Sequence, residues 1–220
     1  LNLLPRQRRI FLSYKRDEAR EAAVQLADAL SDRQFEVFLD TRGVPPADDF
    51  QAQLWHKLCD CDVLLMLNTP GYFQSRWTSA EFGRALAKHI PVLNVTWPDD
   101  TPDKRTQTAS RVELLPEEID DQNGRLAPEA IGRISKQLET LRARSHAIRN
   151  INLISRIDTA VQQVGGQMRG QGWQSSVYVE LADGRLIRLF PNVGVPTSDV
   201  LHWASSNRGE AEAAVAYDEI

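Results

Sequence analysis

The sequence predicts an α/β fold: a doubly wound sheet of five parallel strands with helices on both faces, followed by a small C-terminal module containing a β-hairpin. In the first half of the chain, short apolar runs lack polar alternation, as expected of strands buried on both faces. Segments with helical spacing of apolar residues separate these runs, and helical crossovers connect the strands of parallel sheets. A turn between two apolar runs near the C-terminus predicts the hairpin.

The elements of the parallel sheet can be placed in order along the chain. Five apolar runs are predicted strands: 10–14, 35–39, 63–67, 90–95 and 112–114. Three segments with helical spacing are predicted helices: 18–33, 48–58 and 77–88. A further helix is predicted to begin at Pro128, a favoured first-turn residue. It continues toward Val164 either as one long helix or as two helices broken near 150–152.

The C-terminal part has a different pattern. Residues 165–172 hold four glycines and predict a flexible joint. After it, alternating residues 177–181, the pair Asp183-Gly184 as a two-residue turn, and the apolar run 186–190 predict a hairpin. The module is open to being incomplete, because its last apolar run ends without a terminating signal. The expected parts are a domain over 1–147, a helical and glycine-rich linker over 148–172, and an α+β module over 173–220.

Composition and charge exclude several classes of function. The chain has 220 residues, and its 26 Lys+Arg against 30 Asp+Glu give a formal net charge of −4. This balance argues against a general nucleic-acid binder or a polybasic membrane binder. No apolar run approaches the roughly 20 residues that span a membrane. Cys59 and Cys61 are too few for a disulfide scaffold or a tetrahedral metal site, so we expect a cytoplasmic protein with reduced cysteines and no metal.

Side chains that could carry chemistry gather where the predicted strands end, the edge at which ligands bind in parallel sheets. Three groups follow the first three strands: Ser13, Tyr14, Lys15 and Arg16; Asp40 and Arg42; and Asn68, Thr69 and Tyr72. Trp77 and Glu81 are four residues apart and share one face of the next predicted helix. An aromatic ring and a carboxylate near cations suit a ligand in which a flat heteroaromatic ring is joined to a sugar phosphate.

Each of these residues also has an ordinary structural interpretation. Glu81 could satisfy the dipole of its helix, Trp77 could be a packing residue, and Asp40 could cap a turn. Lys15 and Arg16 could belong to a solvated turn. The four histidines are scattered and are assigned no role. The GxSxG, GxxxxGKS, HExxH and GxGxxG motifs are absent, so the corresponding hydrolase, P-loop, zincin and Rossmann interpretations lack support.

Several segments, in the right order, resemble the signature boxes of Toll/interleukin-1 receptor (TIR) domains. RRIFLSYKRDE resembles the first box, and FEVFLDTRGVPPADDFQAQL resembles the second box with the BB loop that follows it. KLCDCDVLLMLNTPGYFQSRWTSAEFGRAL resembles the third region, and it contains a W-x-x-x-E motif from Trp77 to Glu81. The resemblance covers residues 8–145 and implies a flavodoxin-like arrangement of the sheet.

The resemblance also implies an activity. The enzymatic branch of TIR domains cleaves NAD, and the glutamate of W-x-x-x-E is its catalytic residue, whereas adaptor TIR domains usually lack it. The resemblance therefore makes Glu81 catalytic and Trp77 a stacking wall for the substrate ring. The remaining substrate-binding residues that it implies are Tyr14, Lys15, Arg16, Asp40, Arg42 and Phe50. The BB loop, through which copies of the domain would associate, contains Gly43, Val44, Pro45 and Pro46.

The leading hypothesis is a bacterial-type TIR enzyme in immune defence or effector signalling, activated by self-association. It would cleave NAD, as substrate rather than cofactor, to nicotinamide and ADP-ribose or a cyclic ADP-ribose isomer. One alternative is a non-enzymatic TIR scaffold for homotypic interactions. Another is a different α/β nucleotide binder, flavodoxin-like or related to the deoxyribosyltransferases. The C-terminal module is expected to bind a partner or ligand, or to support oligomerisation.

Overall fold

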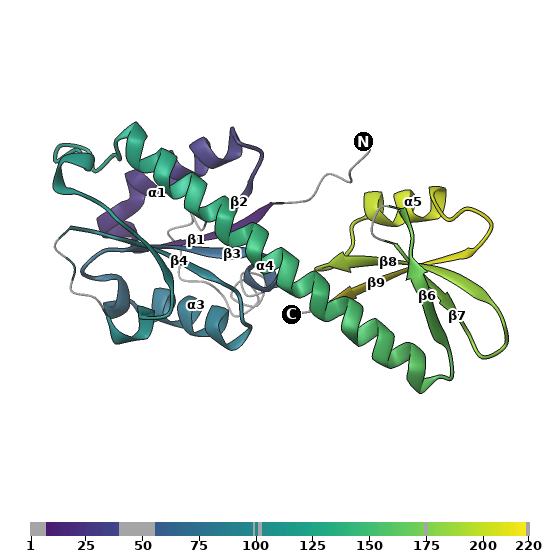
Figure 1. Cartoon of the computed structure of the whole chain (residues 1–220). Coiled ribbons are helices and arrows are strands. Elements are labelled where there is room, and N and C mark those ends of the chain that lie inside the picture. Colours follow the sequence, from purple (N-terminus) through teal and green to yellow (C-terminus); the bar gives the residue numbers. More distant parts are fainter. Residues whose placement is uncertain (1–7, 40–55, 99, 101–102, 174–175, 219–220) are drawn as a thin grey trace. The chain divides into compact units, whose positions relative to one another are not determined.

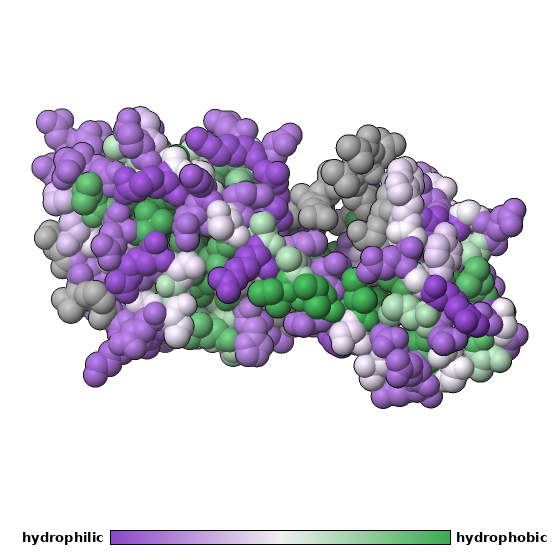
Figure 2. All heavy atoms as spheres, viewed as in Figure 1, coloured by the Kyte–Doolittle hydropathy of each residue, from purple (hydrophilic) through white to green (hydrophobic). Residues whose placement is uncertain are grey.

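A computed structural model describes residues 8–39, 56–98, 100, 103–173 and 176–218 of the chain (Figure 1). Two compact units form: one ends at Ser145 and the other begins at His146. Each unit has its own sheet and its own hydrophobic core. Hydrophilic residues cover most of the face shown in Figure 2. Among the described residues, none of the helices is both long and apolar enough to cross a membrane.

The first unit contains the predicted parallel sheet. Its five strands lie in the order β2-β1-β3-β4-β5, and all four pairings are parallel. Their bounds are β1 (Arg9–Tyr14), β2 (Glu36–Leu39), β3 (Val63–Asn68), β4 (Val92–Thr96) and β5 (Ser110–Glu113). Every residue of β3 and β4 is buried, which explains why their sequences lack polar alternation. The predicted fold class is confirmed.

Helices cover both faces of this sheet. Helix α1 (Arg16–Ser31) and the first part of α4 (Pro128–Gln163) pack on one face, and α3 (Arg76–Ala87) lies on the other (Figure 1). Residues 56–59 are also helical, and the rest of the helix predicted at 48–58 lies outside the described residues. The described part of this unit also contains three short 3-10 turns: η1 (Tyr72–Gln74), η2 (Lys104–Thr106) and η3 (Pro116–Glu118).

Alternation along β1 decides which of its side chains faces which layer. Ile10, Leu12 and Tyr14 belong to the core cluster that contains α1 and α4. Because successive side chains of a strand point to opposite faces, Ser13 points toward the α3 side of the sheet. The same rule places Asn94 of β4 on the α3 side, while Leu93 and Val95 face the core cluster.

The second unit contains a four-stranded sheet in the order β6-β7-β8-β9. Its strands are β6 (Gln167–Gln171), β7 (Val177–Glu180), β8 (Leu186–Val193) and β9 (Glu212–Asp218). The predicted hairpin is confirmed, since β7 and β8 are antiparallel from Val177↔Leu189 to Glu180↔Leu186. β9 runs parallel to β8 and is reached through α5 (Ser198–Ser206). Side chains from the later turns of α4 (Leu153, Ile157 and Val161) pack on the sheet.

The structure corrects the predicted linker over 148–172. Of the two alternatives for the long helix, the continuous one is observed, since α4 extends over 36 residues to Gln163. Gly165, with φ +74°, follows the helix end, and Gly166 N–H donates to the Val161 carbonyl at 2.9 Å. The glycine-rich stretch then forms β6 as the sheet edge. It is therefore a paired strand with an irregularity between Met168 and Gly170, rather than a joint.

The hairpin loop also differs from its prediction. A two-residue turn at Asp183-Gly184 was expected, but the last paired residues are Glu180 and Leu186. Leu181 N–H donates to the Arg185 carbonyl at 2.9 Å, and Gly184 N–H donates to the Leu181 carbonyl at 2.9 Å. Gly184 has φ +83°, so it supplies the left-handed conformation in a loop longer than predicted.

Candidate active site

The centre of the candidate site is a carboxylate held by hydroxyl groups. Glu81 lies on the buried face of α3 and is 7% exposed. Ser13 Oγ donates a hydrogen bond to Glu81 Oε2 at 2.6 Å, and the same Oγ lies 2.6 Å from the Tyr72 hydroxyl oxygen. Ser13 is 1% exposed and Tyr72 is fully buried. A carboxylate held in this way near the carboxyl end of β1 has a defined position, as a catalytic group requires.

Local hydrogen bonds fix the turn that carries Tyr72 against the first turn of α3. Ser75 caps the helix, with its side chain accepting from Thr78 N–H at 3.5 Å. Thr78 Oγ1 donates to the Tyr72 carbonyl, and Ser79 Oγ donates to the Phe73 carbonyl at 3.1 Å. Thr78 is three residues before Glu81, so the two share the buried face of α3. The polar sequence between β3 and α3 therefore fixes Tyr72 relative to the helix that carries Glu81.

The electrostatics of Tyr72 keep its proton in place. Burial, and next the negative charge of Glu81, raise the pKa of the Tyr72 phenol well above its usual value. The hydrogen bond with Ser13 lowers that pKa only in part. The phenol therefore stays neutral and able to donate throughout the pH range of ordinary enzyme assays.

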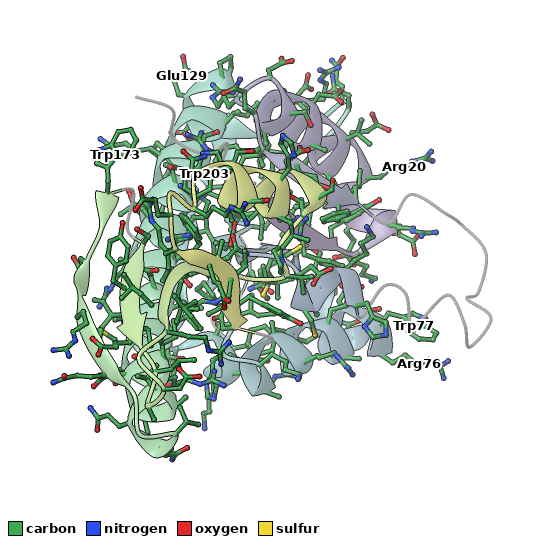
Figure 3. All side chains as sticks on the ribbon, turned by 90° about the vertical axis from the view of Figure 1, so that its right-hand side faces the viewer. Arg20, Arg76, Trp77, Glu129, Trp173 and Trp203 are labelled. Atoms are coloured by element: carbon green, nitrogen blue, oxygen red, sulfur yellow. The ribbon has the colours of Figure 1, made fainter. Side chains whose placement is uncertain are left out.

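Trp77 supplies an accessible aromatic ring one turn before Glu81. Its side chain is among the exposed large hydrophobics, at 39% exposure. The guanidinium carbon of Arg76 lies 4.4 Å from the centre of the Trp77 ring, within the range of a cation–π contact. Figure 3 shows both side chains projecting next to each other from α3. A planar ligand can stack on such a ring without displacing a packed core.

Lys15 is part of a small polar cluster at the start of α1. Its Nζ lies 2.5 Å from Glu18 Oε1, and Glu18 Oε2 accepts from Gly71 N–H at 3.0 Å. Burial raises the pKa of the Glu18 carboxyl, but hydrogen bonds, led by the one from Lys15, together with the charge of Lys15 outweigh this effect, so the pKa is lowered overall. A Cβ on Gly71 would lie 2.1 Å from Glu18 Oε1. The cluster therefore depends on glycine, and part of the charge of Lys15 is already neutralised.

The structure places the other predicted site residues as follows. Tyr14 is 8% exposed and lies in the hydrophobic cluster on the opposite face of β1 from Ser13. Arg16 is half-buried as the first residue of α1. The other predicted residues, which include the whole BB-loop set, lie outside the described residues: Asp40, Arg42, Gly43, Val44, Pro45, Pro46 and Phe50. Their roles stay predictions.

The sequence prediction left two residues out of the site. Ser13 contacts the carboxylate of Glu81 directly, and Tyr72 contacts it through the Ser13 hydroxyl. The prediction placed Ser13 and Tyr72 after strands but assigned neither a role. Strand alternation was a usable signal for Ser13, since it separates Ser13 from the apolar face of Leu12 and Tyr14. Tyr72 carried no comparable signal, because its contact with Ser13 joins residues 59 positions apart.

The cysteines take no part in this arrangement. Cys61 is buried, and its Sγ donates to the Lys57 carbonyl at 3.1 Å. Burial, and then the charges of Asp62 and Asp60, raise the pKa of the Cys61 thiol well above its usual value. Cys59 is half-buried and free. Across the described ranges, no group of three or more His, Cys, Asp or Glu side chains is placed to hold a metal ion.

The strand order and the polar cluster at the carboxyl ends of β1 and β3 define a doubly wound α/β domain of the flavodoxin type. A family model described as TIR domain matches residues 10–126, so the chain belongs to the TIR domain family. This match confirms the predicted family.

The solved structures that are similar to the chain include the following two. One is the activated Roq1 resistosome directly recognizing the pathogen effector XopQ (TIR domains), with 17% identity and a TM-score of 0.38 over 62% of this chain and 84% of that chain. The other is a CMP N-glycosidase of Clostridium botulinum, BcmB, with 19% identity and a TM-score of 0.38 over 48% of this chain and 86% of that chain. A search of curated proteins finds no match.

Proposed function

We propose that the chain is a TIR enzyme that cleaves the bond between nicotinamide and ribose in NAD, with Glu81 as its catalytic residue. The observation that carries the proposal is the carboxylate of Glu81, nearly buried and oriented by Ser13, one helical turn from the exposed ring of Trp77. The membership of the TIR family supports it, because the chain holds the W-x-x-x-E motif of the enzymatic branch.

The chemistry suits a single carboxylate. The nicotinamide of NAD is a pyridinium that leaves as a neutral ring, so no strong general acid is needed. The ribose then develops positive charge like that of an oxocarbenium ion, as in glycoside cleavage. A preoriented negative charge close to that centre lowers the barrier. Water captures the ribosyl centre to give ADP-ribose, whereas an internal nucleophile gives a cyclic isomer.

The remaining roles follow from the resemblance. The ring of Trp77 would stack on the nicotinamide, and Lys15 and Arg16 would meet the phosphates. Tyr14, Asp40, Arg42 and Phe50 would complete the binding surface. NAD is the substrate in this proposal, and no further cofactor is invoked. Copies of the chain would associate through the BB loop, in a cytoplasmic immune-defence or effector setting, with the second unit binding a partner or ligand.

The test is NAD consumption by the full chain under crowded or template-assembled conditions, with products separated by chromatography. Glu81→Gln keeps the size of the side chain and removes its charge, and it should abolish turnover while the protein stays folded. Glu129→Gln is the matched control, since Glu129 is an exposed residue in the first turn of α4. If assembled wild type leaves NAD intact, or Glu81→Gln consumes it at the wild-type rate, the proposal fails.

A non-enzymatic scaffold is the second candidate, and two observations favour it. Glu81 is nearly buried and Lys15 is already paired with Glu18, as structural residues would be. This function predicts homotypic association that survives Glu81→Gln and is disrupted by changes within 43–49. Sedimentation of the wild type, of Glu81→Gln and of a variant changed within the BB loop, run beside the NAD assay, separates the two candidate functions.

A further inference from the structure

We infer that Ser13 and Tyr72 are positioning residues for Glu81, and that Tyr72 orients the carboxylate through Ser13. The inference deepens the proposed function and rests on it. Its basis is one continuous chain of hydrogen bonds from the Tyr72 hydroxyl to Ser13 Oγ and on to Glu81 Oε2, each 2.6 Å long. All three side chains are buried, at 0%, 1% and 7% exposure respectively.

The proton of each hydroxyl can be assigned from the chemistry of the groups. An ionised carboxylate only accepts hydrogen bonds, so the single proton of Ser13 Oγ points to Glu81 Oε2. Ser13 Oγ is then left as an acceptor toward Tyr72, and the Tyr72 hydroxyl must donate to it. Burial and the charge of Glu81 keep that phenol protonated by raising its pKa. The direction is therefore Tyr72 to Ser13 to Glu81.

Both hydroxyls sit on elements that do not move easily. Ser13 belongs to β1, which is paired on both sides, and its register partner on β3 is Met66. Tyr72 is fully buried, its carbonyl accepts from Thr78, and its ring makes an edge contact with Phe73 at 5.1 Å. Anchoring Oε2 to this rigid pair sets the plane of the carboxylate, and thereby the direction of Oε1.

This arrangement predicts a specific kinetic role. Neither hydroxyl lies on the exposed ring surface of Trp77, so neither should contribute much to the binding of NAD. Both should instead hold the negative charge of Glu81 where the ribosyl cation develops. Loss of the chain should lower kcat and leave KM nearly unchanged, the pattern of an interaction that counts in the transition state. A purely structural role, fastening α3 to the sheet, would instead lower stability and leave kcat of the folded protein unaltered.

The two positions differ in how close they are to the carboxylate, and this gives a graded expectation. Ser13→Ala removes the direct donor and should lower kcat on the order of 10- to 100-fold, the range seen when a hydrogen-bond partner that orients a metal ligand is lost. Tyr72→Phe removes only the donor to Ser13, which can still donate to Glu81, so its effect should be smaller, about 3- to 10-fold. Ser13→Thr retains a hydroxyl and should recover part of kcat.

The deciding experiment is a double-mutant cycle on kcat, with KM for NAD and the unfolding temperature of each variant measured beside it. Because Tyr72 acts through Ser13, the combined Ser13→Ala/Tyr72→Phe variant should be no slower than Ser13→Ala alone. Ser135→Ala is the control: it removes another buried hydroxyl, which donates to the Ile131 carbonyl of α4 at 2.8 Å and lies outside the site. It should leave kcat unchanged.

Three results overturn the inference while leaving the proposed function intact. They are a wild-type kcat in folded Ser13→Ala, an additive loss in the double variant, and a loss carried by KM alone. The proposed function fails separately, when wild type and Glu81→Gln are indistinguishable toward NAD. Should Ser13→Ala not fold, Tyr72→Phe and Ser13→Thr still test the chain, because the phenylalanine keeps the ring packing and threonine suits a strand.

Discussion

Arg188 of the second unit offers a test of the structure that does not depend on any activity. This residue lies on β8 and is 8% exposed. Its guanidinium donates to Ser176 Oγ at 2.9 Å, to the Trp173 carbonyl at 3.1 Å and to the Asn207 carbonyl at 2.5 Å. Asn207 is the C-cap of α5, where a positive charge is favourable. One side chain thus joins the sheet, the segment before β7 and the end of α5.

Arg188→Met keeps the length of the side chain and removes its donors. The Asn207 carbonyl would lose the guanidinium, and an acceptor left without a donor costs about 1–3 kcal/mol when buried. The Trp173 carbonyl would still accept from Ser176 Oγ at 2.9 Å. The loss of the contacts at the end of α5 adds to this cost, and relief from burying a charge offsets part of it. We expect a net destabilisation of the second unit of about 2–4 kcal/mol.

Hydrogen exchange read by mass spectrometry suits this prediction, because it reports on each unit separately. Peptides from β7, β8 and α5 should exchange faster in Arg188→Met, while peptides from β1, β3 and β4 keep their wild-type protection. Arg185→Met is the control, since Arg185 lies in the exposed hairpin loop. Equal exchange in the two variants, or a change confined to the first unit, would refute the reasoning.

Three further predictions concern the first unit. Gly71→Ala should displace the Glu18 carboxylate, because its Oε1 would lie 2.1 Å from the added Cβ. The variant should then lose the hydrogen bond from the residue 71 N–H to Glu18 Oε2, and its peptides covering the turn after β3 should show faster hydrogen exchange than those of the wild type. Glu118 has a pKa lowered chiefly by its hydrogen bond from Arg133, so its stabilisation is full above its unfolded pKa and is lost as pH falls through the folded value. Thermal unfolding from about pH 7 to pH 3 should therefore show a smaller acid-side loss in Glu118→Gln, and parallel curves would count against the pair. The raised pKa of buried Cys61 predicts slow alkylation in native protein and fast alkylation in urea, and equal rates would contradict its burial.

The fold was predictable where the pattern of apolar residues within a segment is itself typical of a strand or a helix. β3 is apolar at nearly every position, which is the pattern of a parallel strand buried on both faces. Helix α4 was ambiguous because Asn150 and Asn152 are weak helix formers within an otherwise continuous pattern. Packing decides the matter, since Leu153 and Ile157 of the same helix are buried in the core of the second unit.

The glycine-rich segment shows where local pattern misleads. Four glycines in residues 165–172 indicate a flexible backbone, and nothing in the local sequence reveals a strand with which this segment could pair. The structure pairs Gln167 with Glu180 and Gln171 with Val177 across the edge of the second sheet. Long-range pairing of this kind cannot be derived from one segment, because it depends on a strand that lies further along the chain.

The candidate site was likewise predictable from local sequence only in part. The sequence spacing alone placed Trp77 and Glu81 on one face of a helix, because four residues complete slightly more than one turn. What it could not provide is the contrast between them: Trp77 is 39% exposed and Glu81 is 7% exposed. This difference in exposure depends on how α3 packs against β1. It also depends on Ser13 and Tyr72, which come into contact only in the folded chain.

This contrast bears directly on how one helix could both bind and cleave a dinucleotide. Four residues of α-helix advance about 6 Å, which is comparable to the reach from an aromatic ring to the sugar bonded to it. A ring stacked on the exposed side chain of Trp77 would therefore carry its sugar toward the buried carboxylate of Glu81. Trp77, at the solvent-exposed end of this turn, would bind the ring. Glu81, at the buried end, would supply the negative charge, where electrostatic interactions are less screened by water. The hydrogen bond from Ser13 Oγ to Glu81 Oε2 then holds the carboxylate where the positive charge of the ribose would develop.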